Sequence, residues 1–225
     1  MSRIIAIRAE PALAETVAAG AAIGLSIEAM PLFQLVPVPW SPPDATEIDA
    51  LLVGSANTFR HGGEGLQAFR NKPVHVVGER TADAARASGF AVGLVGNGGL
   101  QGVLDSLVPP LRLLRIGGEE RVEIVAKQGI TVTERACYSV EPRPIPDHMA
   151  ARLRSGEAIV LLHSAAAARH FGAECDRAPV PRSSLKLAAI GARVADAAGT
   201  GWARVETASS PRDDALLALA RDMCH

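Results

Sequence analysis

The sequence predicts an α/β protein built from two parallel sheets, and three observations lead to that prediction. Short runs of aliphatic residues alternate with alanine-rich helical stretches along the whole chain. The runs are apolar on both faces, as in parallel strands that are covered by helices on each side. Motifs from the first half of the chain recur in the second half, which indicates a duplicated sheet-forming unit. Together these features indicate the α/β class.

The elements follow one another in a regular order. The runs predicted to be strands are Ile4–Ile7, Glu28–Phe33, Ala50–Val53, Val74–Val77, Ala91–Val95, Leu111–Ile116, Ile130–Glu134, Ala158–Leu162, Leu187–Ile190 and Arg204–Thr207. Helices predicted between them include Pro11–Ala22, Thr81–Ala87, Leu100–Leu107 and Val194–Ala198. Ten strands suit two sheets of five strands better than a single sheet.

An internal repeat supports the two sheets. A strand-Ser-Ala-helix order at 51–60 recurs at 160–171, and a strand-Gly-x-Arg-helix order at 76–90 recurs at 188–202. The matched positions are Ser55 with Ser164, Ala56 with Ala165, Gly78 with Gly191, and Arg80 with Arg193. Two motifs repeated in the same order indicate that one unit has been duplicated.

The proline pattern leaves two domain divisions open. Pro109-Pro110 would split the chain into contiguous halves. Two other segments, 31–43 and 136–146, each carry a strand into alternating prolines, which cannot continue a helix or a central strand. Two such crossings predict a discontinuous arrangement. Its first domain is 1–37 plus 143–225, its second is 40–140, and the crossings lie at 37–43 and 139–146.

Composition excludes several classes of function. The formal net charge of −1 argues against a nucleic-acid-binding protein. The three cysteines are far apart and form no CxxC or Cys/His cluster, so neither a metal site nor a disulfide framework is expected. The opening apolar run is too short for a signal peptide, and no run is long enough to span a membrane. A reduced, cytoplasmic protein without membrane association is expected.

Four loops that follow strand ends are the candidate ligand-binding segments. They are Ser55-Ala56-Asn57, Gly78-Glu79-Arg80-Thr81, Ser164-Ala165-Ala166 and Gly191-Ala192-Arg193. Open α/β sheets bind ligands at the carboxyl ends of their strands, where small residues expose backbone N–H groups suited to carboxylate or phosphate. Taken alone, any one such loop is explained better by helix capping. Four of them in corresponding places favour the binding of an anionic ligand.

These residues resemble the uroporphyrinogen-III synthase family. The resemblance is carried by the opening strand IIAIR ending in Arg8, by SANTFR after an apolar strand, by VGERTADAARASGF, and by Tyr138 before a proline-rich crossing. It covers nearly the whole chain, in order and at similar spacing.

Two segments depart from the family pattern. The family commonly has Gly-Pro-Thr-Thr where this chain has Gly191-Ala192-Arg193-Val194, so hydroxyl contacts are missing there. The family often has Arg-Gly-Glu where this chain has Arg115-Ile116-Gly117-Gly118. The arginine is displaced by one position, and in a strand this places a side chain on the opposite face.

The resemblance implies two flavodoxin-like parallel-sheet domains joined by a two-stranded linker, with the active site in the cleft between them and no cofactor. It implies a monomeric, cyclising hydro-lyase of heme biosynthesis. The substrate is hydroxymethylbilane, a linear tetrapyrrole with eight carboxylates, which closes to uroporphyrinogen III with ring D inverted and loss of water. The enzyme's task is then mainly geometric: it must hold the chain so that the substituted carbon of ring D attacks.

Site residues follow from the same resemblance. Tyr138 is the expected acid for departure of the hydroxyl group, with a packed strand tyrosine as the other interpretation. The expected substrate-binding residues are Arg8, Ser55, Ala56, Asn57, Gly78, Arg80, Thr81, Gly117, Ser164, Ala165, Gly191 and Arg193. Arg60 and Arg169, five residues beyond the serines, are expected to face solvent.

Other functions fit the sequence less well. The segment GLVGNGGLQG (93–102) has Gln101 where a dinucleotide-binding fingerprint needs glycine. Neither Ser55 nor Ser164 lies in a G-x-S-x-G motif, which argues against a serine hydrolase. The alternative that stays open is a non-catalytic binding or sensor protein for an anionic metabolite, because the same loops would serve it.

Overall fold

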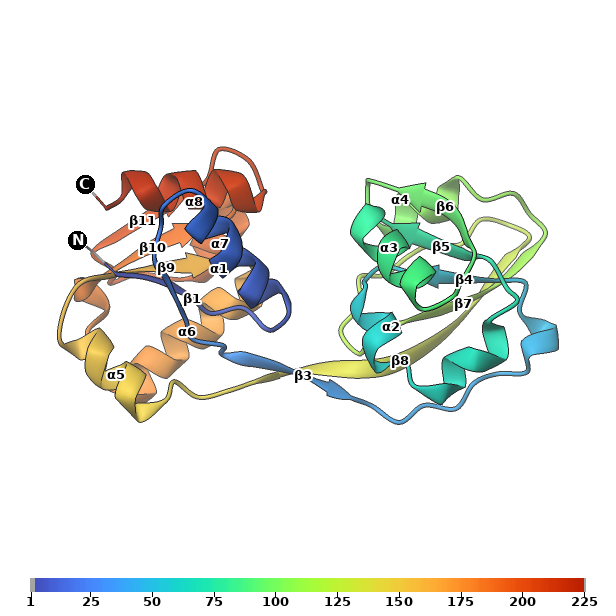
Figure 1. Ribbon diagram of the computed structural model, residues 1–225, viewed down its shortest axis with the longest axis horizontal. Helices are drawn as coiled ribbons and strands as arrows, with labels where there is room; N and C mark the ends of the chain where they lie inside the picture. The colour runs from blue at the N-terminus through green and yellow to red at the C-terminus, as the bar shows by residue number, and fades with distance from the viewer. Residues whose placement is uncertain (1–2, 225) are drawn as a thin grey trace. The chain divides into compact units, whose positions relative to one another are not determined.

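The computed structural model describes residues 3–224, and its contacts divide the chain into two compact units (Figure 1). Unit 1 comprises Met1–Gln34 and Glu141–His225, and unit 2 comprises Leu35–Val140. The chain does not divide at Pro109-Pro110, because β7 (Leu111–Gly118), which follows the prolines, pairs in parallel with β4 (Ala50–Val53), which precedes them.

Unit 1 contains a five-stranded sheet in the order β11-β10-β9-β1-β2, with neighbouring strands parallel. Its strands are β1 (Arg3–Ala6), β2 (Ile27–Ala29), β9 (Ala158–Leu162), β10 (Leu185–Ala189) and β11 (Arg204–Thr207). Its helices are α1 (Ala12–Ala22), α5 (Asp147–Arg154), α6 (Ala165–Arg177), α7 (Ala192–Ala197) and α8 (Asp213–Asp222), with the 3₁₀ turn η3 (Arg182–Ser184).

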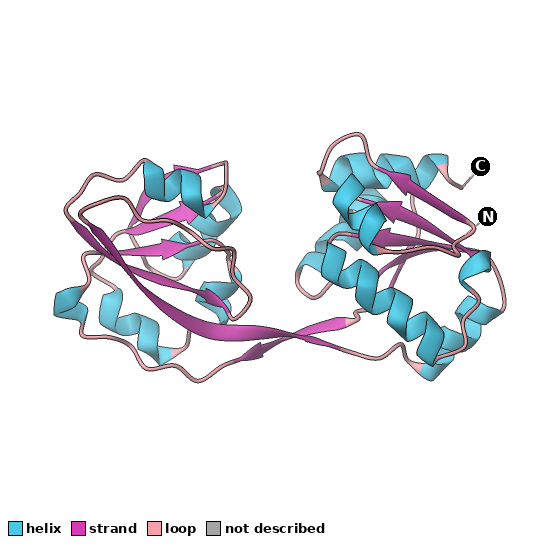
Figure 2. Ribbon diagram, turned by 180° about the vertical axis from the view of Figure 1, so that it is seen from behind, coloured by secondary structure: helices cyan, strands magenta, loops and turns pink. Residues whose placement is uncertain are grey.

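Helices cover both faces of this sheet (Figure 2). One apolar cluster includes Phe171 of α6 and Met149 of α5, and the other includes Leu13 of α1 and Leu216 of α8. The central strand β9 is buried along its whole length. This burial explains why Ala158–Leu162 is apolar without alternation, and the predicted doubly covered parallel sheet is confirmed.

Unit 2 contains a six-stranded sheet in the order β3-β8-β7-β4-β5-β6, in which β8, β7, β4, β5 and β6 run parallel to their neighbours. Its remaining strands are β3 (Phe33–Pro37), β5 (Val74–Val77), β6 (Val92–Gly96) and β8 (Ile130–Pro142). Its helices are α2 (Asn57–His61), α3 (Glu79–Ala87) and α4 (Leu100–Asp105), with the 3₁₀ turns η1 (Ala45–Glu47) and η2 (Glu64–Phe69).

The two sheets share one spatial order with a different chain path. The repeat seen in the sequence matches β4 with β9 and β5 with β10. Reading outward from these central strands, β5-β6 corresponds to β10-β11, and β7-β8 corresponds to β1-β2. Apart from the linking strand β3, the strands of unit 2 begin at β4, whereas those of unit 1 begin at β1, so the five matched strands of one unit are a circular permutation of the other. Unit 1 follows the flavodoxin-like order 2-1-3-4-5 when its strands are numbered along the chain.

Two strands carry the chain between the units. Both β3 and β8 cross the boundary between unit 1 and unit 2, and they are neighbours in one sheet. Within unit 2, the Val38 amide donates to the Cys137 carbonyl oxygen at 3.0 Å. The prolines that follow β3 and β8 prevent either strand from extending the sheet further.

The predicted strand Glu28–Phe33 is wrong as a single element. It divides into β2 and β3, which belong to different sheets. Pro31 has no backbone N–H to donate to a ladder, and the flanking Met30 and Leu32 amides pair with carbonyl oxygens of Ala6 and Ile7. The described residues therefore form eleven strands rather than ten.

Candidate active site

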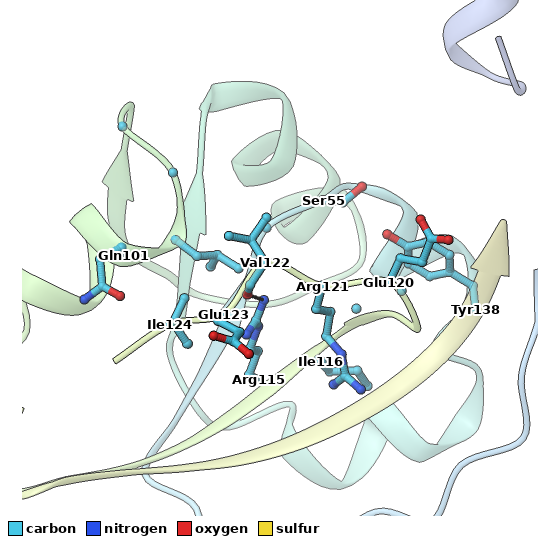
Figure 3. A pocket seen from close by; sticks show the side chains of 16 residues that line it. Ser55, Gln101, Arg115, Ile116, Glu120, Arg121, Val122, Glu123, Ile124 and Tyr138 are labelled. Atoms are coloured by element: carbon cyan, nitrogen blue, oxygen red, sulfur yellow. Dashed lines mark hydrogen bonds between the residues drawn. The ribbon is translucent and has the colours of Figure 1, made fainter. Parts of the chain in front are cut away.

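A pocket of about 400 Å³ lies at the carboxyl ends of β4 and β7 in unit 2 (Figure 3). Four segments supply its walls: the end of β4, the loop before α4, the end of β7 and the segment after it, with Tyr138 of β8. The lining residues are Gly54, Ser55, Gly98–Gln101, Arg115–Gly118, Glu120–Ile124 and Tyr138. This is the sheet edge at which open α/β folds bind ligands.

Tyr138 is the titratable phenol of this pocket. It is 8% exposed, and its ring lies 5.8 Å from the His61 ring between centroids. Burial raises the pKa of the Tyr138 hydroxyl, opposed by hydrogen bonding to the Ser55 side chain and the Gly118 backbone. The hydroxyl therefore stays protonated at neutral pH and can act as a donor.

Ser55 and its neighbours place backbone N–H groups at the pocket edge. The Ser55 hydroxyl accepts a hydrogen bond from the Asn57 amide at 3.3 Å, and Ala56 is the N-cap of α2. The glycines at 62, 63 and 65 end α2 after five residues, so its dipole is small. A helix this short adds little positive potential to the pocket edge.

The loop between β6 and α4 forms a second wall. Gly98 and Gly99 line the pocket, and Gly99 has a φ of +90°, a conformation that side-chain-bearing residues rarely adopt. The segment set aside as a weak dinucleotide fingerprint therefore serves as a tight turn at the pocket. These two glycines were not predicted to be site residues.

Charged side chains enter the pocket from β7 and the segment after it. The Arg115 guanidinium donates to Glu134 Oε1 and to the Val122 carbonyl oxygen, each at 2.7 Å. Arg121 Nη1 lies 3.6 Å from the other oxygen of Glu134. Glu120 and Glu123 also line the pocket, which therefore carries both signs of charge.

In unit 1, the corresponding loops follow β9 and β10. Ser164 is the N-cap of α6, and its hydroxyl accepts from the Ala167 amide at 3.1 Å. Gly191 is the N-cap of α7 without a side-chain cap bond, and Arg193 is exposed in that helix. The predicted equivalence of Ser55 with Ser164 holds in position, since each serine follows a central strand of its sheet.

Arg8 lies in a cluster of polar groups at the end of β1. Its Nη1 donates to both carboxylate oxygens of Asp213, at 2.9 and 3.2 Å, and to the buried Thr16 hydroxyl at 3.2 Å. His163 Nε2 lies 3.4 Å from Asp213 Oδ1. Among the described residues, neither ring nitrogen of this buried side chain makes a hydrogen bond. The His163 ring and then Arg8 hold the pKa of Asp213 at about 2, against partial burial.

The structure brings some of the expected residues together. Ser55, Gly117 and Tyr138 line one pocket. Ala56 and Asn57 adjoin that pocket but do not line it, and Asn57 Oδ1 accepts from the Arg60 guanidinium at 3.0 Å. Gly78, Arg80 and Thr81 lie at the start of α3, where Thr81 is buried. Arg8, Ser164, Ala165, Gly191 and Arg193 belong to unit 1.

Among residues 3–224, no group of three or more His, Cys, Asp or Glu side chains is arranged to hold a metal ion. Over the same range, none of the helices has the length and apolarity needed to cross a bilayer.

Comparison with known proteins agrees with this architecture. Residues 14–218 match the family model described as uroporphyrinogen-III synthase HemD. The fold is similar to that of uroporphyrinogen-III synthetase from Helicobacter pylori 26695, with a TM-score of 0.67 and 16% identity, covering 99% of this chain and 100% of that one.

A second similar structure is a mutant uroporphyrinogen III synthase from the extremely thermophilic bacterium Thermus thermophilus, with a TM-score of 0.53 and 17% identity, covering 100% of this chain and 99% of that one. No curated protein sequence matches the chain significantly. At these identities the structural likeness shows the fold, whereas the family model spans most of the sequence. The chain therefore belongs to the uroporphyrinogen-III synthase family, the cyclising lyases of heme biosynthesis.

Proposed function

We propose that this chain closes hydroxymethylbilane into uroporphyrinogen III, with Tyr138 as the proton donor and the pocket of unit 2 as the site at which the reacting end is held. The observation that carries this assignment is the buried Tyr138 in the lining of a pocket that also has glycine-rich turns in its walls, with burial raising the pKa of the Tyr138 hydroxyl. Such walls expose backbone N–H groups, which suit the carboxylate arms of this substrate.

The reaction begins with loss of the hydroxyl group from ring A. A proton delivered to that oxygen allows it to leave as water, and the remaining fragment is an electrophilic azafulvene. Ring D attacks through its substituted carbon to give a spiro intermediate, which fragments and closes again with ring D inverted. One water is released for each ring closed, and no oxidant or reductant is consumed.

Tyr138 suits the first step because its proton is available at neutral pH. A phenol whose pKa is raised stays neutral, so it can donate a hydrogen bond to the departing oxygen or transfer its proton. The Ser55 hydroxyl, which interacts with Tyr138, supplies a second polar contact at the same point. The closing step returns a proton from the attacking pyrrole carbon, so no net change of charge is required.

Carboxylate arms of the substrate are assigned to the loops at the strand ends. In unit 2 the assigned residues are Ser55, Ala56, Asn57, Gly78, Arg80, Thr81 and Gly117. In unit 1 they are Arg8, Ser164, Ala165, Gly191 and Arg193. Each charge-assisted hydrogen bond contributes about 1.5–3 kcal/mol, so several together can select one conformer of a flexible chain.

Isomer analysis tests the proposal directly. The purified chain is incubated with hydroxymethylbilane, the products are oxidised, and the type I and type III uroporphyrins are separated by chromatography. Without an enzyme, the free position of ring D closes and gives type I. Type III product above that background is expected. Tight binding of the tetrapyrrole with type I product alone would instead identify a non-catalytic binding protein.

We further propose that the protein works as a monomer in the cytoplasm. A monomer is what the family resemblance implies, and the three cysteines are free, as in a reducing compartment. Sedimentation equilibrium tests the first point and cell fractionation tests the second.

A further inference from the structure

The connection between β7 and β8 differs from the usual link between parallel neighbours. Such strands need a crossover connection, which is normally a helix. Here residues 119–129, called the crossover strap below, make the connection without a helix. Val122 and Val125 on the strap are 81% and 77% exposed. The strap therefore is not held in place by burial of these side chains.

Ile124 packs against an apolar cluster of unit 2, and polar contacts hold the strap on either side of it. Arg115, on β7, donates from Nη2 to the Val122 carbonyl oxygen and from Nη1 to Glu134 on β8, each at 2.7 Å. Gln101, on α4, exchanges two hydrogen bonds with the Val125 backbone, at 3.0 and 2.8 Å. Arg115 and Gln101 thus bind the middle of the strap at two points three residues apart, and nearer its ends the Glu119 amide donates to the Tyr138 carbonyl oxygen and Lys127 Nζ to the Asp105 carbonyl oxygen, each at 2.9 Å.

Arg115 is the more buried of the two residues whose side chains bind the middle of the strap. It is 4% exposed, and a buried guanidinium requires partners for its charge and its donors. Its two acceptors lie on two different segments, so the planar guanidinium group fixes the position of the strap relative to the sheet. Neither strand pairing nor the apolar clusters of unit 2 depend on the Val122 carbonyl group.

The strap forms one wall of the pocket. Residues 120–124 line it, and Figure 3 shows the Arg115 side chain extending from β7 to the backbone at Val122. Ser55 and Tyr138 belong to the same lining, and Figure 3 shows Glu120 of the strap beside Tyr138. A displacement of residues 120–124 therefore changes the shape of the pocket, while the Glu119 amide at the start of the strap donates to the Tyr138 carbonyl oxygen at 2.9 Å.

We propose that Arg115 is a positioning residue that fixes the crossover strap as a wall of the pocket and so determines which carbon of ring D reaches the electrophile. This inference rests on the proposed function. Inversion competes with direct closure, and the two differ only in which atom is brought to the reacting carbon. A displacement of about 1 Å can cost on the order of 100-fold in rate, so a loosened wall favours the direct product.

The test compares Arg115→Gln with Arg112→Gln. Arg112 lies on the same strand and pairs with Asp49 at 2.7 Å, but it does not contact the strap or line the pocket. Hydrogen–deuterium exchange is measured at the amides of residues 120–125, and the ratio of type III to type I product is measured with hydroxymethylbilane. Retained circular dichroism shows that each variant is folded.

In Arg115→Gln, amide exchange at 120–125 is expected to rise at least 10-fold, and kcat/KM for type III product to fall by roughly 10- to 100-fold with a larger type I share. Arg112→Gln is expected to match the parent protein in both measurements. Arg115→Lys, which retains the charge but lacks the planar fork, is expected to lie between them. Gln101→Ala provides a second route to a loosened strap, with the same direction of change.

Unchanged exchange in both Arg115→Gln and Gln101→Ala would overturn the anchoring role. Faster exchange with an unchanged isomer ratio would overturn the link to the product. Failure of the proposed function is recognised separately, because the parent protein itself would then give type I product only; the exchange measurement would still decide whether Arg115 holds the strap.

Discussion

The Tyr138 ring lies so close to Gly118 that a β-carbon at position 118 would stand 2.9 Å from Cε2 of the ring and 3.2 Å from Cζ. Gly118 is on β7 and Tyr138 is its partner on β8, next to a register shift between the two strands. The glycine therefore makes room for the aromatic ring, and the position of the Tyr138 hydroxyl depends on it.

Gly118→Ala is expected to displace the ring and lower kcat by roughly 10- to 100-fold. Overpacking of this kind costs about 1–3 kcal/mol of unfolding free energy. Gly102→Ala is the matched control, because a β-carbon at position 102 meets nothing within 4 Å. Kinetics and urea denaturation of both variants check the expectation, and equal activity of the two would argue against a fixed position for the ring.

Tyr138→Phe removes the hydroxyl group and retains the ring, so it distinguishes the chemical role of the hydroxyl from the packing role of the ring. The phenylalanine ring retains the packing against His61 and Gly118, so circular dichroism and thermal unfolding are expected to change little. Loss of a general acid lowers kcat on the order of 100-fold or more, with KM less affected. Steady-state kinetics provide the measurement. Turnover within twofold of the parent protein would remove the acid role and leave Tyr138 as a packed strand residue.

Substitutions at Ser164 distinguish capping of helix α6 from binding of a substrate carboxylate. Ser164→Ala removes the acceptor for the Ala167 amide and is expected to lower stability by about 0.5–2 kcal/mol. Ser164→Asp retains an acceptor and places a negative charge at the start of α6, so stability should be preserved. If the loop binds a carboxylate, the aspartate repels it and KM rises. Comparison of unfolding free energy with KM in the two variants decides between these roles.

Asp213 gives a pH dependence of stability with a definite sign. The pKa of Asp213 is lowered from 3.8 to about 2 in the folded protein. Its ionised form therefore adds to the free energy of unfolding, and this stabilisation is fully present above about pH 4. As the pH falls through about 2 the carboxylate is protonated and the contribution is lost. Asp213→Asn is therefore expected to be less stable than the parent protein above pH 4, with the difference disappearing towards pH 2.

The fluorescence of Trp202, in a Trp40→Phe background, reports unfolding of unit 1 in this experiment, because the chain has two tryptophans and Trp202 belongs to unit 1. Asp222→Asn, on the same helix α8, is the control. A constant stability difference between pH 2 and pH 6 would contradict the pairing of Asp213 with Arg8 and His163.

The sequence predicted the strands well wherever a buried, apolar run stood between turn residues. Ala50–Val53 and Ala158–Leu162 were located at their observed bounds, because a parallel strand covered on both faces needs nothing but apolar side chains. The split of 28–33 into β2 and β3 was missed, since a proline inside an apolar run does not reveal that its two sides join different sheets.

The candidate site was predicted in part. Ser55, Gly117 and Tyr138 were identified as site residues, and the structure places them in one pocket. Gly98 and Gly99 fit a glycine-rich turn and do not complete a dinucleotide-binding motif, so the sequence did not predict them as site residues, although any loop after a parallel strand end belongs to that edge. Arg115 was discounted for its displacement along the strand, and its acceptors at Val122 and Glu134 are not visible in local sequence.

The sequence by itself determined the alternation of strands and helices, the repeat of the Ser-Ala and Gly-x-Arg loops, and resemblance to one family, because these depend on short-range patterns of burial and turn formation. Only the tertiary structure decided that one unit is a permutation of the other, that the crossover strap forms a pocket wall, and that Arg8 pairs with Asp213, 205 positions away. These features depend on which distant segments pack together, and side chains far apart in the chain carry no local sign of their partners.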